Sequence, residues 1–382
     1  MANVALSLGY VKALLAIILS SIILSVFGIL TGAVGATTNL SSYMIISNVF
    51  GKLGAKAINI LFAITLSGWF GVTLSFFAEA SNQILALGYQ IWLILGTFLM
   101  ILTAIYGFKG LRIFSIIAVP FLLLLLYWFS IVSLKNTSIA DILAIKGNNS
   151  LSFGSAVSLF VGGLMVGVAI FPDLTRYTKS VKDGIIAGAT SFMTVIIFAT
   201  PIMFPILRYQ QANIVTIMQN FGYPLWALLL IVLASWSSND NNLYSGALSL
   251  AAVFNKISKN IIVLALAGLG YFCSAINITN YFIAFLMLLS AIIPPVASIY
   301  CVNCFYKVEI CTKAINWNAI IAYLIGILTA LLTTPRSSFG FEVITLTTIP
   351  ALDGYLIAGI FYAFFHKSTT IPYIKKISKK LF

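Results

Sequence analysis

One polar run stands out in the chain: Ala234-Ser235-Trp236-Ser237-Ser238-Asn239-Asp240-Asn241-Asn242. It interrupts an otherwise apolar segment from Tyr223 to Phe254, whose 32 residues would form a helix about 48 Å long. Seven of the nine side chains in the run are hydroxyl, amide or carboxyl groups, and these cannot all face lipid. A helix that carries them must face a polar cavity or other helices. A binding site would explain this density, and hydrogen bonding between helices is the alternative.

The composition around this run is that of a membrane protein. Of the 382 residues, 61% are hydrophobic and 8% are charged, whereas soluble proteins average about 45–50% apolar and about 25% charged residues. This excludes a soluble enzyme, a nucleic-acid-binding domain and a disordered chain, because a soluble domain must cover its surface with polar groups. The net charge is +13, and we expect the excess Lys and Arg residues to lie in cytoplasmic loops. The sequence predicts an all-α polytopic membrane protein.

Eleven apolar segments have the length of a transmembrane span, which is about 20 residues. They cover residues 9–34, 57–80, 91–107, 112–134, 152–172, 184–207, 223–254, 259–277, 279–304, 317–335 and 347–366. We expect each to be helical, because backbone groups in lipid must be satisfied within their own segment.

The basic residues predict the orientation of these spans. Sixteen of the 21 Lys and Arg residues fall on the side of the membrane that carries the C-terminus. The other side has only Lys12, Lys135, Lys146, Arg208 and Arg336. The C-terminus is therefore expected in the cytoplasm, and eleven spans then place the N-terminus outside. No charge in Met1–Leu8 explains an outside start, so either a span precedes Met1 or one of the eleven is wrong.

Three further features mark candidate sites within the spans. The segment Phe160–Pro172 contains three glycines and ends in proline, which predicts either a broken helix that exposes backbone groups or close helix packing. Trp69 lies in the middle of its span within Gly68-Trp69-Phe70-Gly71. With glycines clearing space around it, the indole is expected to stack on a flat ligand. The double proline Pro294-Pro295 must kink or break its helix.

Acidic residues in membrane spans are costly and are usually functional. Glu79, Asp173 and Asp240 lie in spans or at their ends. Glu79 is either a proton carrier near the outer face or an interfacial side chain, and it is too far along the helix to share a ligand with Trp69.

In their order along the chain, these motifs resemble those of cytosine permeases. They are Gly68-Trp69-Phe70-Gly71, the glycine-rich run that ends in Pro172-Asp173-Leu174-Thr175-Arg176-Tyr177, the run Trp236–Tyr244, and Ser290-Ala291-Ile292-Ile293-Pro294-Pro295, and Asn316-Trp317 also fits. From about residue 9 to the C-terminus, the chain is similar to the nucleobase–cation symporter family, which includes cytosine and hydantoin permeases. The polar run is the most specific part of this resemblance.

The resemblance implies a LeuT-like fold of twelve helices, in which two inverted repeats of five helices are followed by two more. The single transporter domain, residues 1–382, would then have four parts. These are an incomplete first repeat (9–134), a second repeat (152–304), two appended helices (317–366) and a basic cytoplasmic tail (367–382). Residues 9–34 match the second family helix, so the sequence is expected to lack the first.

The resemblance also implies the residues of a substrate site. A planar base would stack on Trp69, and the other expected contacts are Thr65, Gly163, Leu164, Asn239 and Asn241. Leu164 stands where a second aromatic residue covers the base in the family. Less polar residues, Leu66, Gly163 and Val166, stand where the family grips cytosine with polar side chains. These changes disfavour cytosine itself, although they leave a flat heterocycle possible.

A coupling ion is implied as well. The family's sodium site maps onto the Ala234 carbonyl and the Ser237 and Ser238 hydroxyls, which makes Na⁺ the candidate ion. Apart from this ion we expect no cofactor, and the expected partners are a small nucleobase-like substrate and the lipid bilayer, with no nucleic acid.

The leading hypothesis is therefore secondary transport of cytosine, a purine or a related heterocycle across the cell's inner (cytoplasmic) membrane, coupled to Na⁺ or H⁺. The alternative is a non-transporting remnant of such a permease with a truncated N-terminus. An enzyme is not expected, because the sequence has no catalytic constellation.

Overall fold

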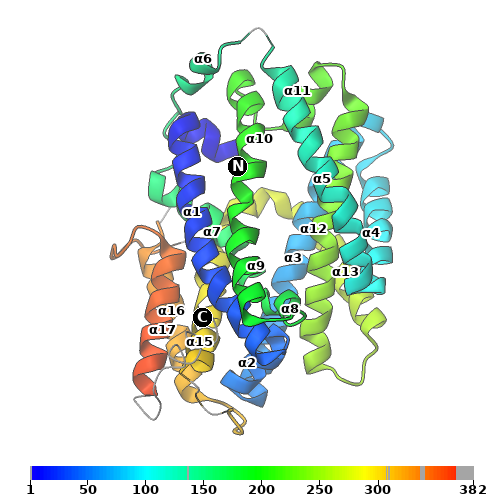
Figure 1. Ribbon diagram of the computed structural model, residues 1–382. Coiled ribbons are helices and arrows are strands. Elements are labelled where there is room, and N and C mark those ends of the chain that lie inside the picture. The colour runs from blue at the N-terminus through cyan, green and yellow to red at the C-terminus, as the bar shows by residue number, and fades with distance from the viewer. Residues whose placement is uncertain (1, 136, 307, 309, 336–339, 367–382) are drawn as a thin grey trace. The chain divides into compact units, whose positions relative to one another are not determined.

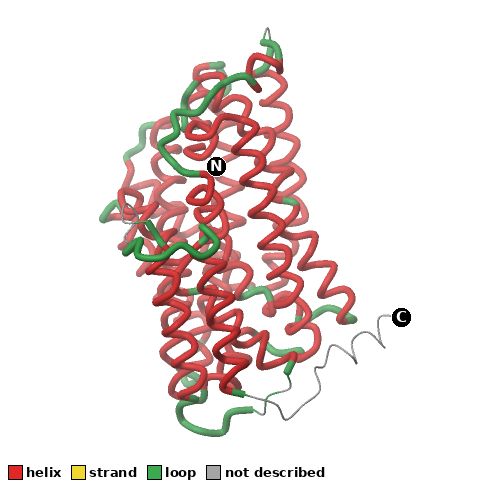
Figure 2. The backbone as a smooth tube through the Cα atoms, turned by 90° about the vertical axis from the view of Figure 1, so that its left-hand side faces the viewer, coloured by secondary structure: helices red, strands yellow, loops and turns green. Residues whose placement is uncertain are grey.

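The computed structural model describes residues 2–366 apart from 136, 307, 309 and 336–339. The described residues form helices joined by loops and turns, and they contain no strand (Figures 1 and 2). The predicted basic tail lies outside the described residues. The chain forms two compact units. Unit 1 consists of residues 1–15, 60–152 and 196–282, and unit 2 of residues 16–59, 153–195 and 283–382. Each unit thus combines segments of both predicted repeats.

Unit 1 contains five long helices and several short ones. It includes most of α3 (Lys52–Leu85) and α10 (Val195–Tyr209), and all of α4 (Tyr89–Tyr106), α5 (Phe108–Ser133), α6 (Ile139–Leu143), α11 (Ile214–Asn220), α12 (Pro224–Val253), α13 (Lys259–Ala275) and the 3₁₀ helix η1 (Ile278–Tyr281). Helix α12 packs against α4, α5 and α13, which stand side by side in Figure 1. Buried apolar residues of α3, α4, α12 and α13 form the core of the unit, among them Phe70, Met100, Leu243 and Leu266.

Unit 2 contains the remaining helices. It includes most of α1 (Ala2–Thr38) and α14 (Phe282–Ile292), and all of α2 (Ser42–Phe50), α7 (Phe153–Ala169), α8 (Pro172–Thr175), α9 (Val181–Met193), α15 (Pro294–Phe305), α16 (Trp317–Thr333) and α17 (Pro350–Phe365). Aromatic stacking joins α1 to α17, because the rings of Phe27 and Tyr355 lie 3.8 Å apart and 16° from parallel.

The eleven expected spans all coincide with helices in the described part of the chain. By length and composition, seven helical segments are long and apolar enough to cross a membrane, and α13, α16 and α17 are shorter apolar helices of 16 or 17 residues. The remaining span is α12, which is long enough at 30 residues but carries the polar run in its middle.

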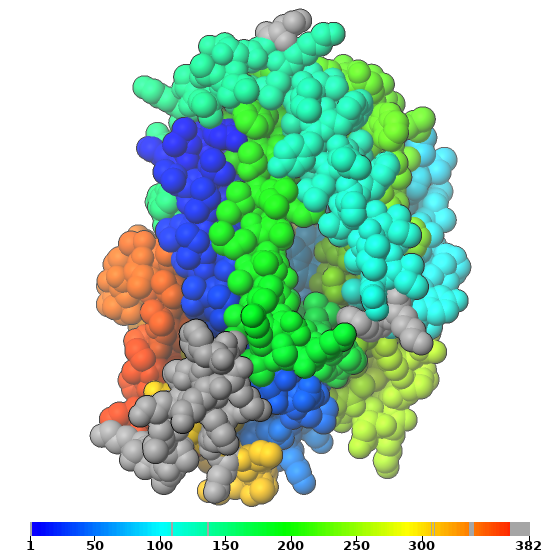
Figure 3. Space-filling view, viewed as in Figure 1, coloured from blue at the N-terminus to red at the C-terminus, as the bar shows by residue number. Residues whose placement is uncertain are grey.

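Exposed apolar side chains show which helices suit a lipid environment. In α5, Ile113, Ile117, Leu124 and Ile131 are each more than 60% exposed, and the cyan residues of this part of the chain lie at the surface in Figure 3. A soluble protein would bury such residues, whereas lipid solvates them.

Proline determines where two helices break. Helix α7 ends at Ala169 and α8 begins at Pro172, while α14 ends at Ile292 and α15 begins at Pro294. The break at Pro294 was predicted from the sequence, whereas for Phe160–Pro172 a broken helix was one of two predicted alternatives. Both breaks lie at a proline, because proline lacks the N–H group of a helical hydrogen bond and its ring clashes with the preceding turn. The three glycines of α7 lie inside intact helix, so they do not break it.

The first residues of the chain are anchored within unit 1. The backbone N–H groups of Asn148 and Asn149 donate to the carbonyls of Leu6 and Ser7, at 3.0 and 2.8 Å. Gly9 bends the chain beside this contact with φ 73°, and a Cβ atom there would lie 2.5 Å from the Ile145 oxygen. Only glycine fits this position.

Candidate functional site

Trp69 lies in α3 of unit 1, and its indole is half-buried. Phe282, the first residue of α14, meets it edge to face, with ring centroids 6.0 Å apart and ring planes at 80°. Phe282 makes a second contact of this kind with Phe76, at 5.5 Å. Such edge contacts hold an aromatic ring in a defined orientation. No local pattern marks Phe282 as a neighbour of Trp69, because the two residues are more than 200 positions apart.

The α3 backbone around Trp69 is packed tightly against α13. Gly71 lies at this contact, where a Cβ atom would come within 2.7 Å of the Gly270 carbonyl oxygen. The Ser67 hydroxyl donates to the Leu266 carbonyl at 2.6 Å. Gly71 therefore permits the close approach of two helices, whereas we expected it to clear space around the indole. Thr65, an expected substrate contact, is buried, and its hydroxyl donates within α3 to the Phe62 carbonyl at 2.8 Å.

The polar run lies on α12, which is helical throughout, and one of its faces is open. Ala234, Ser237 and Asn241 are half-buried and Ser238 is exposed. These four positions share one side of the helix, since residues three and four apart are neighbours on a helix surface. The expected ion ligands and one expected substrate contact, Asn241, therefore lie together on this open face.

The other face of the run is packed and connects α12 to α3 and α4. Asn239 is fully buried. Its Nδ2 lies 3.2 Å from the Phe70 carbonyl oxygen and 3.0 Å from the Met100 sulfur, and its Oδ1 accepts a hydrogen bond from Asn242 at 3.0 Å. Because Phe70 follows Trp69, this contact ties the polar run to the α3 backbone one residue from Trp69. Substrate contact at Asn239, which the resemblance implied, would compete with these bonds.

The carboxyl group of Asp240 also lies on the packed face. The Trp236 Nε1 donates to the Thr103 hydroxyl oxygen at 2.9 Å, and that hydroxyl donates to Asp240 Oδ1. The sequence marked Asp240 as a candidate functional residue. Thr103 was not, because it lies 137 residues away on α4 and no local pattern marks it.

The expected ion ligands lie close together on the open face of α12. The Ser237 hydroxyl lies 3.1 Å from the Ala234 carbonyl oxygen, to which it donates. Ser238 is the next residue on the same open face. Carbonyl and hydroxyl oxygens suit a hard cation, so these residues fit Na⁺ in kind. They approach from one helix only, and further ligands would have to come from elsewhere.

The expected substrate contacts on α7 belong to unit 2. Gly163 and Leu164 are half-buried, and a Cβ atom at Gly163 would meet only the Leu286 side chain, at an ordinary 3.6 Å. Gly162 instead packs against α14, where a Cβ atom would lie 2.5 Å from Ser290 Cβ. Of the two roles proposed for the α7 glycines, close packing therefore applies to Gly162, while Gly163 lies on a less crowded side.

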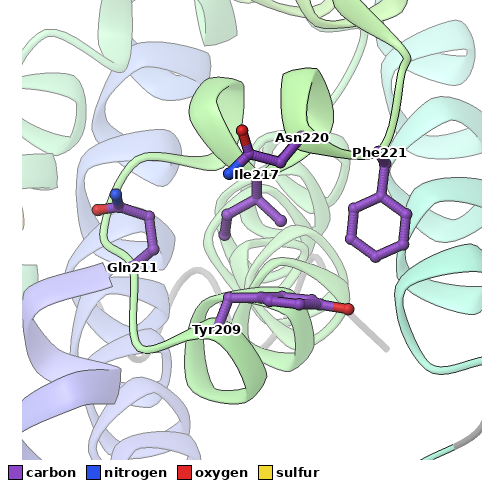
Figure 4. A pocket seen from close by; sticks show the side chains of 5 residues that line it. All are labelled: Tyr209, Gln211, Ile217, Asn220 and Phe221. Atoms are coloured by element: carbon purple, nitrogen blue, oxygen red, sulfur yellow. The ribbon is translucent and has the colours of Figure 1, made fainter.

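A cavity of about 440 Å³ in unit 1 involves none of the expected site residues. Figure 4 shows its lining by Tyr209, Gln211, Ile217, Asn220 and Phe221, from the connections between α10, α11 and α12. Gln83 joins α3 to the neighbouring helix α11 through hydrogen bonds to Thr216 and Gln219, at 3.0 and 2.6 Å. Among the described residues, no three His, Cys, Asp or Glu side chains are grouped closely enough to hold a metal ion.

Comparison with known proteins identifies similar sequences. A family model described as "Permease for cytosine/purines, uracil, thiamine, allantoin" matches residues 1–358. The cytosine permease of Escherichia coli (strain K12) is 27% identical over an alignment of 333 residues, and the match covers 84% of this chain and 78% of that protein. The hydantoin permease of Microbacterium maritypicum is 24% identical over 336 residues, covering 74% and 67%.

Similar folds occur among solved structures. Mhp1, a nucleobase-cation-symport-1 family transporter in a closed conformation with bromovinylhydantoin bound, has a TM-score of 0.78 at 20% identity, covering 94% of this chain and 86% of that one. A Na⁺-coupled sialic acid symporter has a TM-score of 0.64 at 14% identity, covering 95% and 87%. These similarities confirm the all-α, LeuT-like fold expected from the sequence.

Proposed function

Because the chain belongs to the family of permeases for cytosine/purines, uracil, thiamine and allantoin, we propose that it transports a nucleobase or a related planar heterocycle. Permeases are transporters, so the chain is a transporter and not an enzyme. The two relatives are named after cytosine and hydantoin, and both compounds are small, flat, polar rings. An aromatic side chain suits such a ligand because every base offers a π face.

The observation that supports this proposal most is the attachment of the α12 polar run to the α3 backbone next to Trp69. The Asn239–Phe70 hydrogen bond, on the packed face of α12, makes this attachment one residue from the indole, and the half-buried indole and the open face with Asn241 both belong to unit 1. An indole supplies a stacking surface, and amide and hydroxyl groups supply hydrogen bonds to a base edge. Thr65 lies one turn before Trp69 on α3 and would contact the base from there. Asn239 would contribute indirectly, by orienting the polar run.

Gly163 and Leu164, which lie in unit 2, remain substrate contacts that only the resemblance to the family supports. The resemblance puts Leu164 at the position where a second aromatic residue covers the base. This favours a substrate with fewer hydrogen-bonding requirements than cytosine.

The protein is a multi-pass membrane transporter. We place it in the inner membrane with the C-terminus in the cytoplasm, on the basis of its basic loops, and keep the two repeats, 9–134 and 152–304, as its internal organisation. Transport would be coupled to Na⁺, held by Ala234, Ser237 and Ser238, or to H⁺.

The proposal is tested with purified protein in sealed vesicles. Radiolabelled cytosine, uracil, hypoxanthine and hydantoin are each supplied outside, with a sodium gradient, a pH gradient or neither. We expect uptake of at least one free base, competition by other planar heterocycles, and no competition by the ribosides, whose sugar removes the flat shape. Folded protein that takes up none of them under any gradient would instead support the non-transporting alternative.

A further inference from the structure

Asp240 is the group in unit 1 that substrate binding leaves unexplained. It is the only charged residue of α12 and is 1% exposed. Its Oδ1 accepts the Thr103 hydroxyl, while its Oδ2 is buried and has no hydrogen-bond partner among the described residues. The Thr103 oxygen also accepts the Trp236 indole N–H, and its single hydroxyl proton has two acceptors within reach, Asp240 Oδ1 and the Met100 carbonyl oxygen at 3.3 Å. An ionised Asp240 would thus be a buried charge with one hydrogen bond.

The two other buried aspartates are stabilised differently. Asp173 Oδ1 accepts both the backbone N–H and the hydroxyl of Ser42, each at 2.9 Å, at the N-terminus of α2. Asp353, in the first turn of α17, accepts the backbone N–H of Thr347 at 3.1 Å and its hydroxyl. Backbone N–H donors and helix N-termini stabilise a negative charge. Asp240, in the middle of a helix, has neither. The Oδ2 atom is buried without a hydrogen-bond partner among the described residues in all three aspartates, so the difference lies in the donors to Oδ1.

No cation among the described side chains compensates Asp240. Helices α4 and α11, which pack against α12, contain no charged residue, and the charged residues of α5 and α13 lie within the first five residues of their helices. The charged residues of α5 and α13 are Lys109, Arg112 and Lys259. The other titratable residues on α3, α4, α5, α12 and α13 are Lys52, Lys56, Glu79, Tyr89, Tyr106, Tyr127, Tyr244, Tyr271 and Cys273. The Lys259 ammonium lies over the Tyr244 ring, 4.8 Å from its centre. A charge without a partner is costly in a membrane span.

The surroundings of Asp240 suit a proton better than a metal cation. Hard metal cations require about six oxygen ligands, whereas the structure offers one carboxyl group and one hydroxyl. The neighbouring groups are apolar: Trp236 packs against Phe114 with ring centroids 4.8 Å apart, and Met100 and Ala104 belong to the buried core. A proton needs a single oxygen and removes the charge.

We propose that Asp240 binds a proton and that this proton is the coupling ion of transport. The inference rests on the proposed function, of which it specifies the driving ion. The carboxyl group takes up the proton from water on one side of the membrane and releases it to water on the other. Its neighbour in sequence, Asn239, holds α12 to the backbone beside Trp69, so a change in the Asp240–Thr103 contact acts one residue from the substrate region.

The test compares the wild type with Asp240→Asn in sealed vesicles, with the membrane potential clamped at zero. A pH difference of one unit supports about a tenfold accumulation of substrate if one proton moves with each base. We expect the wild type to reach this accumulation without sodium. Asp240→Asn imitates the protonated side chain, so it should still exchange labelled base across the membrane but accumulate none. Thr103→Ser should retain accumulation better than Thr103→Val, because it keeps the hydroxyl. Asp353→Asn is the matched control and should behave as the wild type.

A second measurement does not depend on transport. The infrared spectrum of the wild type should contain the carbonyl band of a buried, protonated carboxylic acid, and this band should be missing from Asp240→Asn but present in Asp353→Asn. Full pH-driven accumulation by Asp240→Asn, or identical carboxylic acid bands in wild type and Asp240→Asn, would overturn the proposal. If the wild type carries no base at all, the proposed function fails, while the infrared comparison still decides whether Asp240 holds a proton.

Discussion

At the residue scale, Trp69 is the side chain on which the substrate proposal depends most. Stacking of one base on an aromatic ring contributes about 1–3 kcal/mol, so Trp69→Ala should weaken substrate affinity by about 5- to 150-fold. Binding of the base in vesicles or detergent measures this directly. Trp69→Phe should lose less, since it keeps an aromatic face. Trp317→Phe is the control, because Trp317 is 63% exposed at the start of α16. Equal affinity in wild type and a folded Trp69→Ala protein would exclude stacking.

At the scale of the element, α7 offers a matched pair of glycines. A Cβ atom at Gly162 would lie 2.5 Å from Ser290 Cβ, whereas one at Gly167 would meet no described atom within 4 Å. Gly162→Ala should therefore destabilise the protein by about 1–3 kcal/mol through overpacking. Gly167→Ala should leave stability unchanged or raise it slightly, because alanine favours helix by about 0.8–1 kcal/mol. Thermal unfolding in detergent checks both. The packing assignment of α7 is wrong if Gly167→Ala proves the more damaging substitution.

At the scale of the whole molecule, the charge distribution predicts one orientation in the membrane. The predicted spans put sixteen of the 21 Lys and Arg residues on the side that carries the C-terminus, and we expect this side to be cytoplasmic. A fluorescent protein fused after Phe382 should fold and fluoresce, and alkaline phosphatase fused there should be inactive. A fusion after Lys146, expected on the opposite side, should show the reverse pattern and serves as the control. An active phosphatase at Phe382 would invert the topology.

Local patterns in the sequence were enough to predict the spans and the helix breaks. Unsatisfied backbone groups are so costly in lipid that an apolar segment of span length has only the helical state available, and the helices coincide with all eleven segments. Pro172 and Pro294 end helical hydrogen bonding through their own covalent structure, so their effect needs no partner. Trp69 and the polar run could also be recognised from the sequence alone. Tryptophan and clustered polar side chains are both uncommon in the middle of a membrane span.

Which atoms of these residues are free for a ligand became clear only from the folded chain. Asn239 and Asn241 look alike in the sequence, yet Asn239 is bonded to the Phe70 carbonyl and Asn241 lies on the open face of α12. Gly162 and Gly163 are neighbours, yet only Gly162 packs tightly against α14. Thr103 and Phe282 carried no local signal. In each case the contact that assigns the role comes from a helix far away in the chain, and the packing of helices, unlike their formation, depends on side chains that no local pattern brings together.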